Sequence, residues 1–257
     1  MLLAAWNVNS LSIRLPRLLA WLEAHEPDVV CLQETKLEDA RFPTLDIASA
    51  GYVAHFAGQK TYNGVALLAR EGSVIDDVAF GIPGFADEQK RVVAATVGGI
   101  RVIGVYVPNG QAVGSDKFAY KLRWYEALRA MLRDDLVRYP SLAVGGDFNV
   151  APEDCDVHDP ALWEGKVHCS AQERAAFAAL LDLGLKDSFR LFTQPENTFS
   201  WWDYRMLAFP KNHGLRIDHI LLSPPLVERC IASRIDRASR KGEKPSDHAP
   251  VLVELRD

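Results

Sequence analysis

The chain has 257 residues, of which 48% are hydrophobic and 25% are charged, and its formal net charge is -5. This length fits one large domain or two small ones and is sufficient to bury a substantial core. The lack of an apolar run of about eighteen residues argues against a membrane span, and the net charge argues mildly against a surface covered in basic side chains, although a local basic groove remains compatible with it.

Short apolar runs alternate with helical patterns along the chain. The apolar runs predict strands at Leu2–Trp6, Val29–Leu32, Val65–Leu68, Val92–Val97, Val102–Tyr106, Leu142–Gly145, Ile217–Leu222 and Val251–Glu254. Apolar residues at spacings of three and four predict helices at Leu15–Ala24, Lys117–Tyr139 and Ala171–Leu183. Ser170 and Glu173 form a capping-box signature at the start of the third helix. Residues 81–90, 151–170 and 203–214 show no clear pattern and are expected to be surface loops.

The connections between strands indicate the fold class. Val92–Val97 and Val102–Tyr106 are joined across Gly98-Gly99 as a hairpin, and many other strands lack an intervening helix. A doubly wound parallel sheet therefore fits poorly, and an α/β fold with two packed sheets and helices outside fits better. Because no linker or repeat divides the chain, we predict a single domain over residues 1–257.

The cysteines and the amino-terminal residues bear on the cellular compartment. Four cysteines lie far apart and form no CxxC pair, at Cys31, Cys155, Cys169 and Cys230. A zinc site or a disulfide framework is therefore not expected. The first seven residues lack the basic region and the long apolar stretch of a signal peptide. Both observations favour a cytoplasmic protein.

Five clusters of polar residues lie at the ends of predicted strands. They are Trp6-Asn7-Val8-Asn9-Ser10, Cys31-Leu32-Gln33-Glu34-Thr35-Lys36, Val144-Gly145-Gly146-Asp147-Phe148-Asn149, Arg216-Ile217-Asp218-His219 and Lys244-Pro245-Ser246-Asp247-His248. Loops at strand ends are where functional sites usually lie. Carboxylates that converge with amides and histidines suit a hard divalent cation with oxygen ligands, Mg²⁺ or Mn²⁺, which would polarise a phosphate.

Each cluster also has a purely structural interpretation. These interpretations are an exposed acid beside Lys36 for Glu34, a turn for Asp147-Phe148-Asn149, an ion pair with Arg216 for Asp218, and a satisfied core histidine for His248. Five independent accidents in one chain are improbable, so the joint pattern favours a functional site.

The succession of these clusters resembles the exonuclease III family of Mg²⁺-dependent DNA repair nucleases. The motifs that carry the resemblance are Trp-Asn-Val-Asn-Ser, Leu-Gln-Glu-Thr-Lys, Gly-Asp-Phe-Asn, Leu-Arg-Ile-Asp-His-Ile-Leu and Ser-Asp-His-Ala-Pro, together with Asn63-Gly64-Val65-Ala66, Tyr106-Val107-Pro108-Asn109 and Phe199-Ser200-Trp201-Trp202. The resemblance covers essentially the whole chain. It implies a four-layered α/β sandwich with two central mixed sheets flanked by helices and a site at one edge.

The resemblance also implies roles for the metal and for the attacking water. Glu34 would be the principal Mg²⁺ ligand, with Asn7 beside it and Asp247 as a second-site or water-mediated ligand. Asp147 would orient or deprotonate the water, and Asn149 would hold Asp147 and the phosphate. Ser246 is then expected to be a turn or capping hydroxyl, because the attacking group is water.

Further roles are implied around the phosphate. His248, oriented by a hydrogen bond with Asp218, would donate to a non-bridging phosphate oxygen. An Asp behind an imidazole fixes its tautomer and favours the cationic form. Tyr106 and Asn109 would contact the phosphate or aid the leaving group. In-line attack by water would then break the bond to the 3′ oxygen, with catalysis resting on positioning and electrostatics.

The DNA-binding surface implied by the resemblance has two parts. Side chains expected to meet backbone phosphates, which give affinity without sequence specificity, are Lys36, Arg91, Lys121 and Lys244. Those expected to line a pocket for an extrahelical sugar are Trp201, Leu215 and Ile217. One of Trp201 and Trp202 is expected to pack in the core instead.

Two residues depart from the pattern of the family. Asn9 replaces an acid found in some relatives, which would weaken a secondary metal contact. His168 stands in a segment where many relatives carry small residues beside the DNA. Its imidazole could narrow the space for an internal abasic nucleotide while leaving a 3′ terminus accessible, or it could simply pack or face solvent.

The function expected from these residues is that of a monomeric DNA repair phosphodiesterase. It would act on double-stranded DNA with damaged or blocked 3′ ends or abasic sites, as a 3′→5′ exodeoxyribonuclease and 3′-phosphatase. AP endonuclease activity is placed in doubt by His168. The alternatives are a full AP endonuclease of base excision repair, a phosphoesterase of the same fold acting on lipid or inositol phosphates, and a non-catalytic DNA-binding module.

Overall fold

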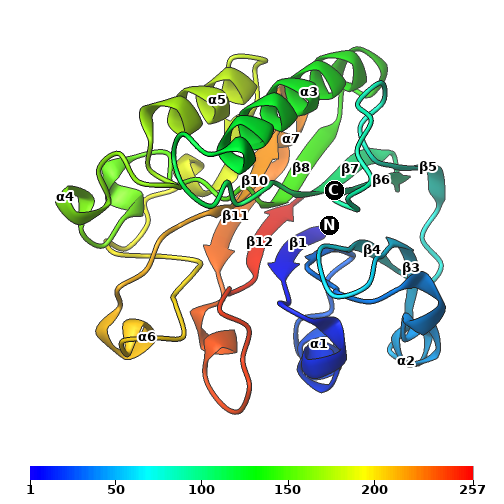
Figure 1. Ribbon diagram of the computed structural model, residues 1–257. Coiled ribbons are helices and arrows are strands. Elements are labelled where there is room, and N and C mark those ends of the chain that lie inside the picture. Colours follow the sequence, from blue (N-terminus) through cyan, green and yellow to red (C-terminus); the bar gives the residue numbers. More distant parts are fainter. Residues whose placement is uncertain (257) are drawn as a thin grey trace.

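A computed structural model describes residues 1–256, which form two six-stranded β-sheets packed face to face with helices outside (Figure 1). The predicted α/β fold with two packed mixed sheets is therefore confirmed. No helix within residues 1–256 is long and apolar enough to cross a membrane.

The first sheet is built from both ends of the chain. Its strands, in spatial order, are β11 (Cys230–Ile235), β12 (Val251–Leu255), β1 (Leu2–Asn7), β2 (Val29–Gln33), β4 (Val65–Arg70) and β3 (Tyr52–Ala57). The first strand, β1, pairs parallel with β2 and antiparallel with the last strand, β12. The helices α1 (Leu11–His25) and α2 (Thr44–Ser49) lie below this sheet in Figure 1.

The second sheet comes from the middle of the chain. Its strands, in spatial order, are β5 (Ile75–Phe80), β6 (Val92–Val97), β7 (Ile100–Tyr106), β8 (Leu142–Asp147), β10 (Asp218–Leu222) and β9 (Lys186–Asp187). The hairpin between β6 and β7 turns at Gly98 and Gly99, whose φ values of 56° and 81° suit the turn that matches strand twist. The helices α3 (Asp116–Arg138) and α5 (Ala171–Leu181) cover the outer face, and Ser170 and Glu173 form the predicted capping box.

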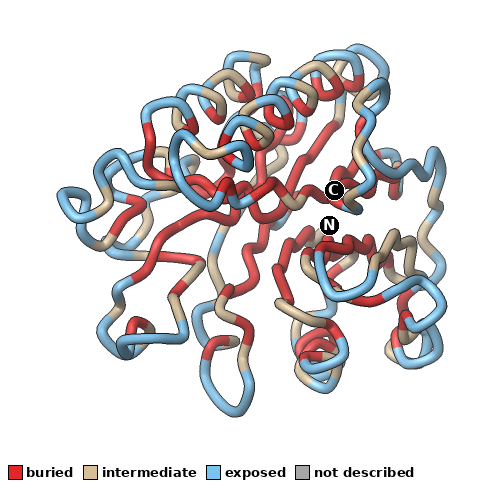
Figure 2. The backbone as a smooth tube through the Cα atoms, viewed as in Figure 1, coloured by how far each residue is buried: buried red, intermediate tan, exposed pale blue. Residues whose placement is uncertain are grey.

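The interior between the sheets is apolar and narrow. The residues of the core strands are buried, and the exposed residues are concentrated on the outer helices and loops (Figure 2). At Gly104 of β7, a Cβ atom would lie 2.9 Å from the Cβ of Cys31 on β2, in the opposite sheet. The sheets approach closely here because no side chain separates them, and an added methyl would force them apart.

The strands at the edges of the two sheets were not predicted from the sequence. The strands β3, β5, β9 and β11 were not predicted, and they are the four edges of the two sheets. Their side chains are largely exposed or half-buried, so they lack the continuous apolar runs of the central strands. All eight predicted strands are present, with small differences at their ends.

The helix predictions were right for the long helices and wrong for short ones. The three predicted helices correspond to α1, α3 and α5, although α1 begins four residues earlier than expected. Two regions predicted as loops each contain a short helix, α4 (Pro160–Trp163) and α6 (Ala208–Lys211), and α7 (Pro224–Arg229) was also missed. Helices of four to six residues are too short to show an apolar repeat.

Candidate active site

Six strands from both sheets bring polar residues to one edge of the sandwich. Asn7 is the last residue of β1, Tyr106 of β7 and Asp147 of β8, while Glu34 directly follows β2. Because β10 runs antiparallel to β8, its first residue, Asp218, lies opposite Asp147. His248 lies three residues before the start of β12 in the chain. The edge therefore gathers groups from all five predicted clusters.

Asn7 links the carboxylates of the two sheets. Its side-chain amide donates to Glu34 Oε1 at 2.8 Å and to Asp147 Oδ2 at 3.0 Å. Lys36 Nζ lies 2.7 Å from Glu34 Oε2, so the predicted neighbour pair exists. Burial disfavours the carboxylate of Glu34, but the charge of Lys36 and the hydrogen bond from Asn7 outweigh burial and lower its pKa. Glu34 is therefore ionised at neutral pH.

His248 lies between two carboxylates. Its Nδ1–H donates to Asp218 Oδ2 at 2.9 Å, and its Nε2 faces Asp147 Oδ2 at 3.8 Å. Burial disfavours the imidazolium, but the charges of Asp218 and Asp147 overcome burial and raise the pKa of His248 to about 10. His248 is consequently a cation and a hydrogen-bond donor at neutral pH. The interpretation as an ordinary core histidine is thus insufficient.

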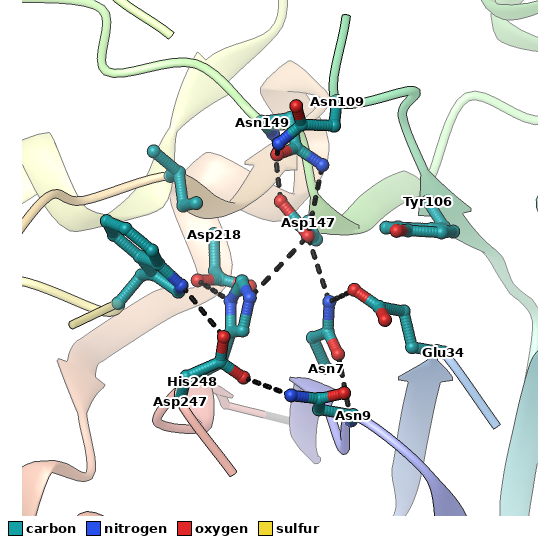
Figure 3. A network of polar contacts seen from close by, with 12 residues as sticks. Asn7, Asn9, Glu34, Tyr106, Asn109, Asp147, Asn149, Asp218, Asp247 and His248 are labelled. Carbon is teal, nitrogen blue, oxygen red and sulfur yellow. Dashed lines mark hydrogen bonds and ion pairs between the residues drawn. The ribbon is translucent and has the colours of Figure 1, made fainter. Parts of the chain in front are cut away.

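Asp147 occupies the centre of the cluster. Figure 3 shows it between His248 on one side and Asn7 with Glu34 on the other, with Asn149 and Asn109 above. Burial raises the pKa of Asp147 to about 7, and the nearby carboxylates of Asp218 and Glu34 act in the same direction. A carboxylate with a pKa in this range can accept a proton near neutral pH.

The turn at Asp147-Phe148-Asn149 serves as both a turn and part of the site. The backbone N–H of Asn149 donates to Asp147 Oδ1 at 2.9 Å, and Asn149 has a φ of 52°. Its side-chain amide donates to Val107 O at 2.9 Å and to Asp147 Oδ2 at 3.2 Å, while Asn109 Nδ2 lies 3.3 Å from Asn149 Oδ1. Asn109 and Asn149 therefore lie side by side above Asp147.

The donor set fits a hard cation. One ligand atom from each of Glu34, Asp147 and His248 lies within 4.8 Å of the others. Because His248 is protonated, the ligands that remain are carboxylate oxygens, and the amide nitrogen of Asn7 lies between them. Oxygen ligands suit Mg²⁺ or Mn²⁺. The ammonium group of Lys36 against Glu34 shows that this position accepts positive charge.

Asp247 lies outside that three-residue group. Its two oxygens accept hydrogen bonds from Asn9 Nδ2 at 2.8 Å and from Trp201 Nε1 at 3.1 Å. Asn9, which departs from the family pattern, thus binds an acid that was expected near the metal. Each oxygen keeps a second lone pair, so these bonds orient Asp247 and leave it able to contact a metal directly or through water.

Tyr106 and Arg91 form a stacked pair beside the metal side of the site. The guanidinium carbon of Arg91 lies 4.6 Å from the centre of the Tyr106 ring. Burial, together with the charges of Glu34 and Asp147, raises the pKa of Tyr106 well above its usual value. Tyr106 therefore keeps its proton. Arg91 is 8% exposed and donates to Gln89 Oε1 and Tyr106 O, so it acts first as support for Tyr106.

Among the other predicted DNA contacts, one is wrong. Lys121 has no exposed surface, and its ammonium group lies 2.5 Å from Glu173 Oε1, so it cannot meet a DNA phosphate. Lys244 is exposed, and Lys36 is partly exposed at the site. Leu215 and Ile217 are buried in a small apolar cluster, with Trp201 partly exposed at its rim. Trp202, by contrast, is a core residue with no exposed surface.

His168 lies beside the asparagines and is not on the surface. Its Nδ1–H donates to Asn149 O at 2.8 Å, its Nε2 is 3.4 Å from Asn109 Nδ2, and its ring centre is 6.4 Å from that of Trp201. Burial, assisted by the charge of Lys121, lowers the pKa of His168 to about 4. A neutral imidazole therefore fills the space between the asparagines and Trp201.

Several supporting residues could not have been found from local patterns. Ser200 Oγ donates to Asp218 Oδ2 at 2.6 Å and accepts from the Asp218 N–H, which fixes the acid behind His248. Arg216 was a candidate partner for Asp218, but its ion pairs are with Asp156 and Asp187. That interpretation is wrong because the true partners lie 60 and 29 residues away in the chain. Ser246 has the expected structural role, donating to Asn7 O and accepting from the His248 N–H.

Almost the whole chain matches known proteins in sequence and fold. The endonuclease/exonuclease/phosphatase family matches residues 4–248. Exodeoxyribonuclease III of Haemophilus influenzae is 37% identical over 265 residues, which cover 98% of this chain and 98% of that protein. Among solved structures, the 3′ phosphatase NExo from Neisseria, bound to a product DNA hairpin, is 46% identical with a TM-score of 0.97. An AP endonuclease from Archaeoglobus fulgidus is 37% identical with a TM-score of 0.95, and both matches cover 100% of each chain.

The chain belongs to the endonuclease/exonuclease/phosphatase family. The resemblance to exonuclease III read from the motifs is confirmed by the full-length match to the Haemophilus enzyme.

Proposed function

We propose that the chain is a Mg²⁺-dependent DNA repair hydrolase that acts mainly at 3′ ends, as a 3′-phosphatase and 3′→5′ exodeoxyribonuclease. The observation that carries this proposal is the arrangement of a carboxylate, an imidazolium and a candidate metal ligand around one point, with His168 beside it. The similarity to a Neisseria 3′ phosphatase and to exodeoxyribonuclease III supports the choice of DNA as substrate.

Glu34 and Asn7 would hold the cation, and Mn²⁺ would be able to replace Mg²⁺ because the ligands are oxygens. The bound ion would supply charge neutralisation and polarisation at the phosphate. Lys36 would leave Glu34 when the ion binds and would then be free to meet a DNA phosphate. Asp247 would act as a second-site or water-mediated ligand, held in orientation by the two hydrogen bonds that it accepts.

Asp147 and His248 would divide the proton and charge chemistry. Asp147 would take a proton from the attacking water, whose oxygen forms the new bond to phosphorus while the bond from phosphorus to the 3′ oxygen breaks. His248, held by Asp218, would donate a hydrogen bond to a non-bridging oxygen and stabilise the charge that develops there. The same bond breaks in removal of a 3′ phosphate, in exonuclease cleavage and in incision before an abasic site, so one set of residues serves all three reactions.

Asn149, Asn109 and Tyr106 would position the phosphate. The two amides lie above Asp147 and are joined by a hydrogen bond from Asn109 to Asn149. Tyr106 retains the proton that it would donate to the leaving oxygen. Trp201, with Leu215 and Ile217 behind it, would border the pocket for the terminal sugar.

His168 would determine whether the enzyme acts on 3′ ends or on internal abasic sites. Its neutral ring fills space between Asn109, Asn149 and Trp201, where an internal abasic nucleotide would have to enter. A 3′ terminus needs less room because no chain continues beyond it. Full AP endonuclease activity is the second candidate, supported by the similarity to the Archaeoglobus enzyme. A lipid or inositol phosphoesterase is not favoured by any of the similar proteins.

We further propose that the active form is a single-domain monomer in the cytoplasm. The two sheets contribute to one site, and the described cysteines are all unpaired, as a reducing compartment requires.

One panel of labelled duplexes tests the proposal. Duplexes with a 3′ phosphate, a recessed 3′ hydroxyl or an internal abasic site are incubated with Mg²⁺ and, in parallel, with EDTA. We expect rapid phosphate release, slower exonuclease cleavage and weak abasic incision, all abolished by EDTA. Activity that survives EDTA would contradict the metal assignment. A preference for abasic incision would favour the second candidate, and His168→Gly should increase incision if the imidazole blocks entry.

A further inference from the structure

A buried ion pair lies behind the loops that carry the phosphate-positioning residues. Lys121 on α3 and Glu173 at the start of α5 both have no exposed side-chain surface. Removing two charges from water costs free energy that their attraction repays only when the remaining hydrogen bonds are also satisfied, and apolar side chains usually serve stability as well or better. The location of this pair therefore calls for an explanation beyond stability.

The lysine binds the backbone of the two asparagine loops. Besides Glu173, its ammonium group donates to Asn149 O at 2.6 Å and to Asn109 O at 3.1 Å. All three N–H donors of Lys121 are thereby used, and two of them end on residues whose side chains lie above Asp147.

The glutamate binds the backbone of the histidine loop. Glu173 Oε1 accepts from the His168 N–H at 2.9 Å, and its Oε2 accepts from the N–H and the hydroxyl of Ser170. The ring of His168 in turn donates to Asn149 O, the same carbonyl that Lys121 binds. The ion pair and the carbonyl form one connected set of hydrogen bonds that joins three loops.

The residues held in this way have left-handed backbone conformations. Asn149 has a φ of 52° and His168 a φ of 75°, in a region that is uncommon for residues other than glycine, although Asn and His enter it more often than most. Such conformations persist only where surrounding contacts fix them. Asn149 is fixed here by the bond that its carbonyl oxygen accepts from Lys121, and His168 by the bond that its N–H donates to Glu173.

We propose that Lys121 and Glu173 are positioning residues: the pair holds Asn149 and His168 in their left-handed conformations and so sets both the rate of phosphate-ester cleavage and the preference for 3′ ends. This inference rests on the proposed function. Neither side chain touches the DNA or the reacting atoms, because both are buried. Their effect passes through the side chains of Asn149, Asn109 and His168.

The first test removes the charge of the acid and keeps its shape. For Glu173→Gln we expect kcat for 3′-phosphate release to fall about 10²-fold, with KM changed by no more than about threefold. Abasic incision, expressed relative to phosphate release, should rise because His168 is no longer fixed. Asp135→Asn is the matched control, since Arg101 and Asp135 form another buried pair, at the end of β7 remote from Tyr106. It should lower Tm without changing kcat or the ratio of activities.

The second test separates positioning from folding. The double variant Lys121→Met with Glu173→Leu replaces the pair by apolar side chains, which should preserve the fold. We expect its Tm to equal or exceed that of Glu173→Gln while kcat remains low. A folded double variant with the kcat and the activity ratio of the wild type would overturn the proposal.

A third measurement does not depend on activity. In protein labelled with ¹⁵N at histidine, the Nδ1 resonance of His168, assigned with a His168→Asn variant, reports its hydrogen bond to Asn149 O. We expect this resonance to shift in Glu173→Gln and to stay unchanged in Asp135→Asn. An unchanged resonance in both would overturn the positioning role. If the wild type cleaves no DNA substrate, the proposed function fails, yet this resonance still tests the pair.

Discussion

Two lysine–glutamate pairs flank the active site, and their surroundings give them opposite properties. Lys36 and Glu34 lie 2.7 Å apart in the loop that follows β2. Their side chains are 26% and 17% exposed. Lys121 and Glu173 lie 2.5 Å apart with no exposed side-chain surface, between the helices α3 and α5 that cover the second sheet. We propose that the first pair opens to admit a cation or DNA. The second is surrounded by backbone partners that hold it closed.

The difference shows that burial, more than the identity of the residues, decides what an ion pair does. A pair that keeps partial contact with water, such as Lys36 and Glu34, contributes about 1 kcal/mol or less to stability, so its members can change partners. A buried pair that loses one member leaves an uncompensated charge, which is strongly destabilising. We therefore expect substitutions in the first pair to affect activity and those in the second to affect both stability and activity.

The largest expected effect is on activity in the exposed pair. Glu34→Gln should reduce phosphate release about 10³-fold at saturating Mg²⁺, because it removes the proposed charged ligand of the cation. Its free energy of unfolding should change by about 1 kcal/mol or less. Steady-state kinetics and urea denaturation measure the two quantities. Glu38→Gln, at an exposed acid four residues away, is the control and should leave both unchanged. Near-normal activity in Glu34→Gln would remove Glu34 from the metal site.

The next effect is on stability in the buried pair. Lys121→Met should lower the free energy of unfolding by about 3 kcal/mol or more, since Glu173 is left as a buried charge without its partner. The matched variant Lys36→Met should lower it by about 1 kcal/mol or less. Urea denaturation of the two variants compares them directly. Equal losses would show that burial does not distinguish the pairs.

A smaller effect concerns pH. His168 has a pKa of about 4 in the folded protein against an ordinary value of 6.5, so the unfolded chain takes up the proton first. Its contribution to stability is therefore complete above about pH 6.5 and is lost as the pH falls toward 4, by roughly 2 kcal/mol between pH 7 and 4.5. His168→Asn, whose side chain tolerates a positive φ, should show a shallower decline in urea denaturation. Parallel declines would mean that His168 titrates normally.

The smallest effect tests whether the exposed pair opens. Because Lys36 occupies Glu34 Oε2, Lys36→Met should tighten Mg²⁺ binding about two- to fivefold, as expected for loss of a competing surface ion pair. Titration calorimetry at low salt measures this change. Lys60→Met, at an exposed position, serves as the control. Weaker Mg²⁺ binding in Lys36→Met would indicate that Lys36 supports the metal site instead of competing for it.

The central strands of the fold could be predicted from the sequence, and the edge strands could not. Central strands such as β4 and β8 are buried on both faces and read as continuous apolar runs. An edge strand such as β5 is exposed along most of its length, so its pattern resembles that of a loop. Strand pairing between distant segments, and hence which strands form the edges, leaves no local signal.

The site was predictable where it is made of short motifs. Glu34, Asp147, Asp218 and His248 each stand beside strand ends whose apolar runs mark them, and all four meet at one edge. The error at Lys121 arose because its charge was given more weight than its place in the helix. Lys121 lies three residues after Phe118 and three before Trp124, both buried, and so belongs to the buried stripe of α3.

The pairing of the first strand with the last has a consequence for protein synthesis. While the ribosome is still translating residue 240, β1 has β2 on one side and nothing yet on the other, because β12 has not been made. His248 and Asp247 lie just before β12 in the chain and are fixed in place when β12 closes against β1. A chain released early lacks the imidazolium of the site. Truncated translation products should therefore be unable to cut DNA in the cell that makes them.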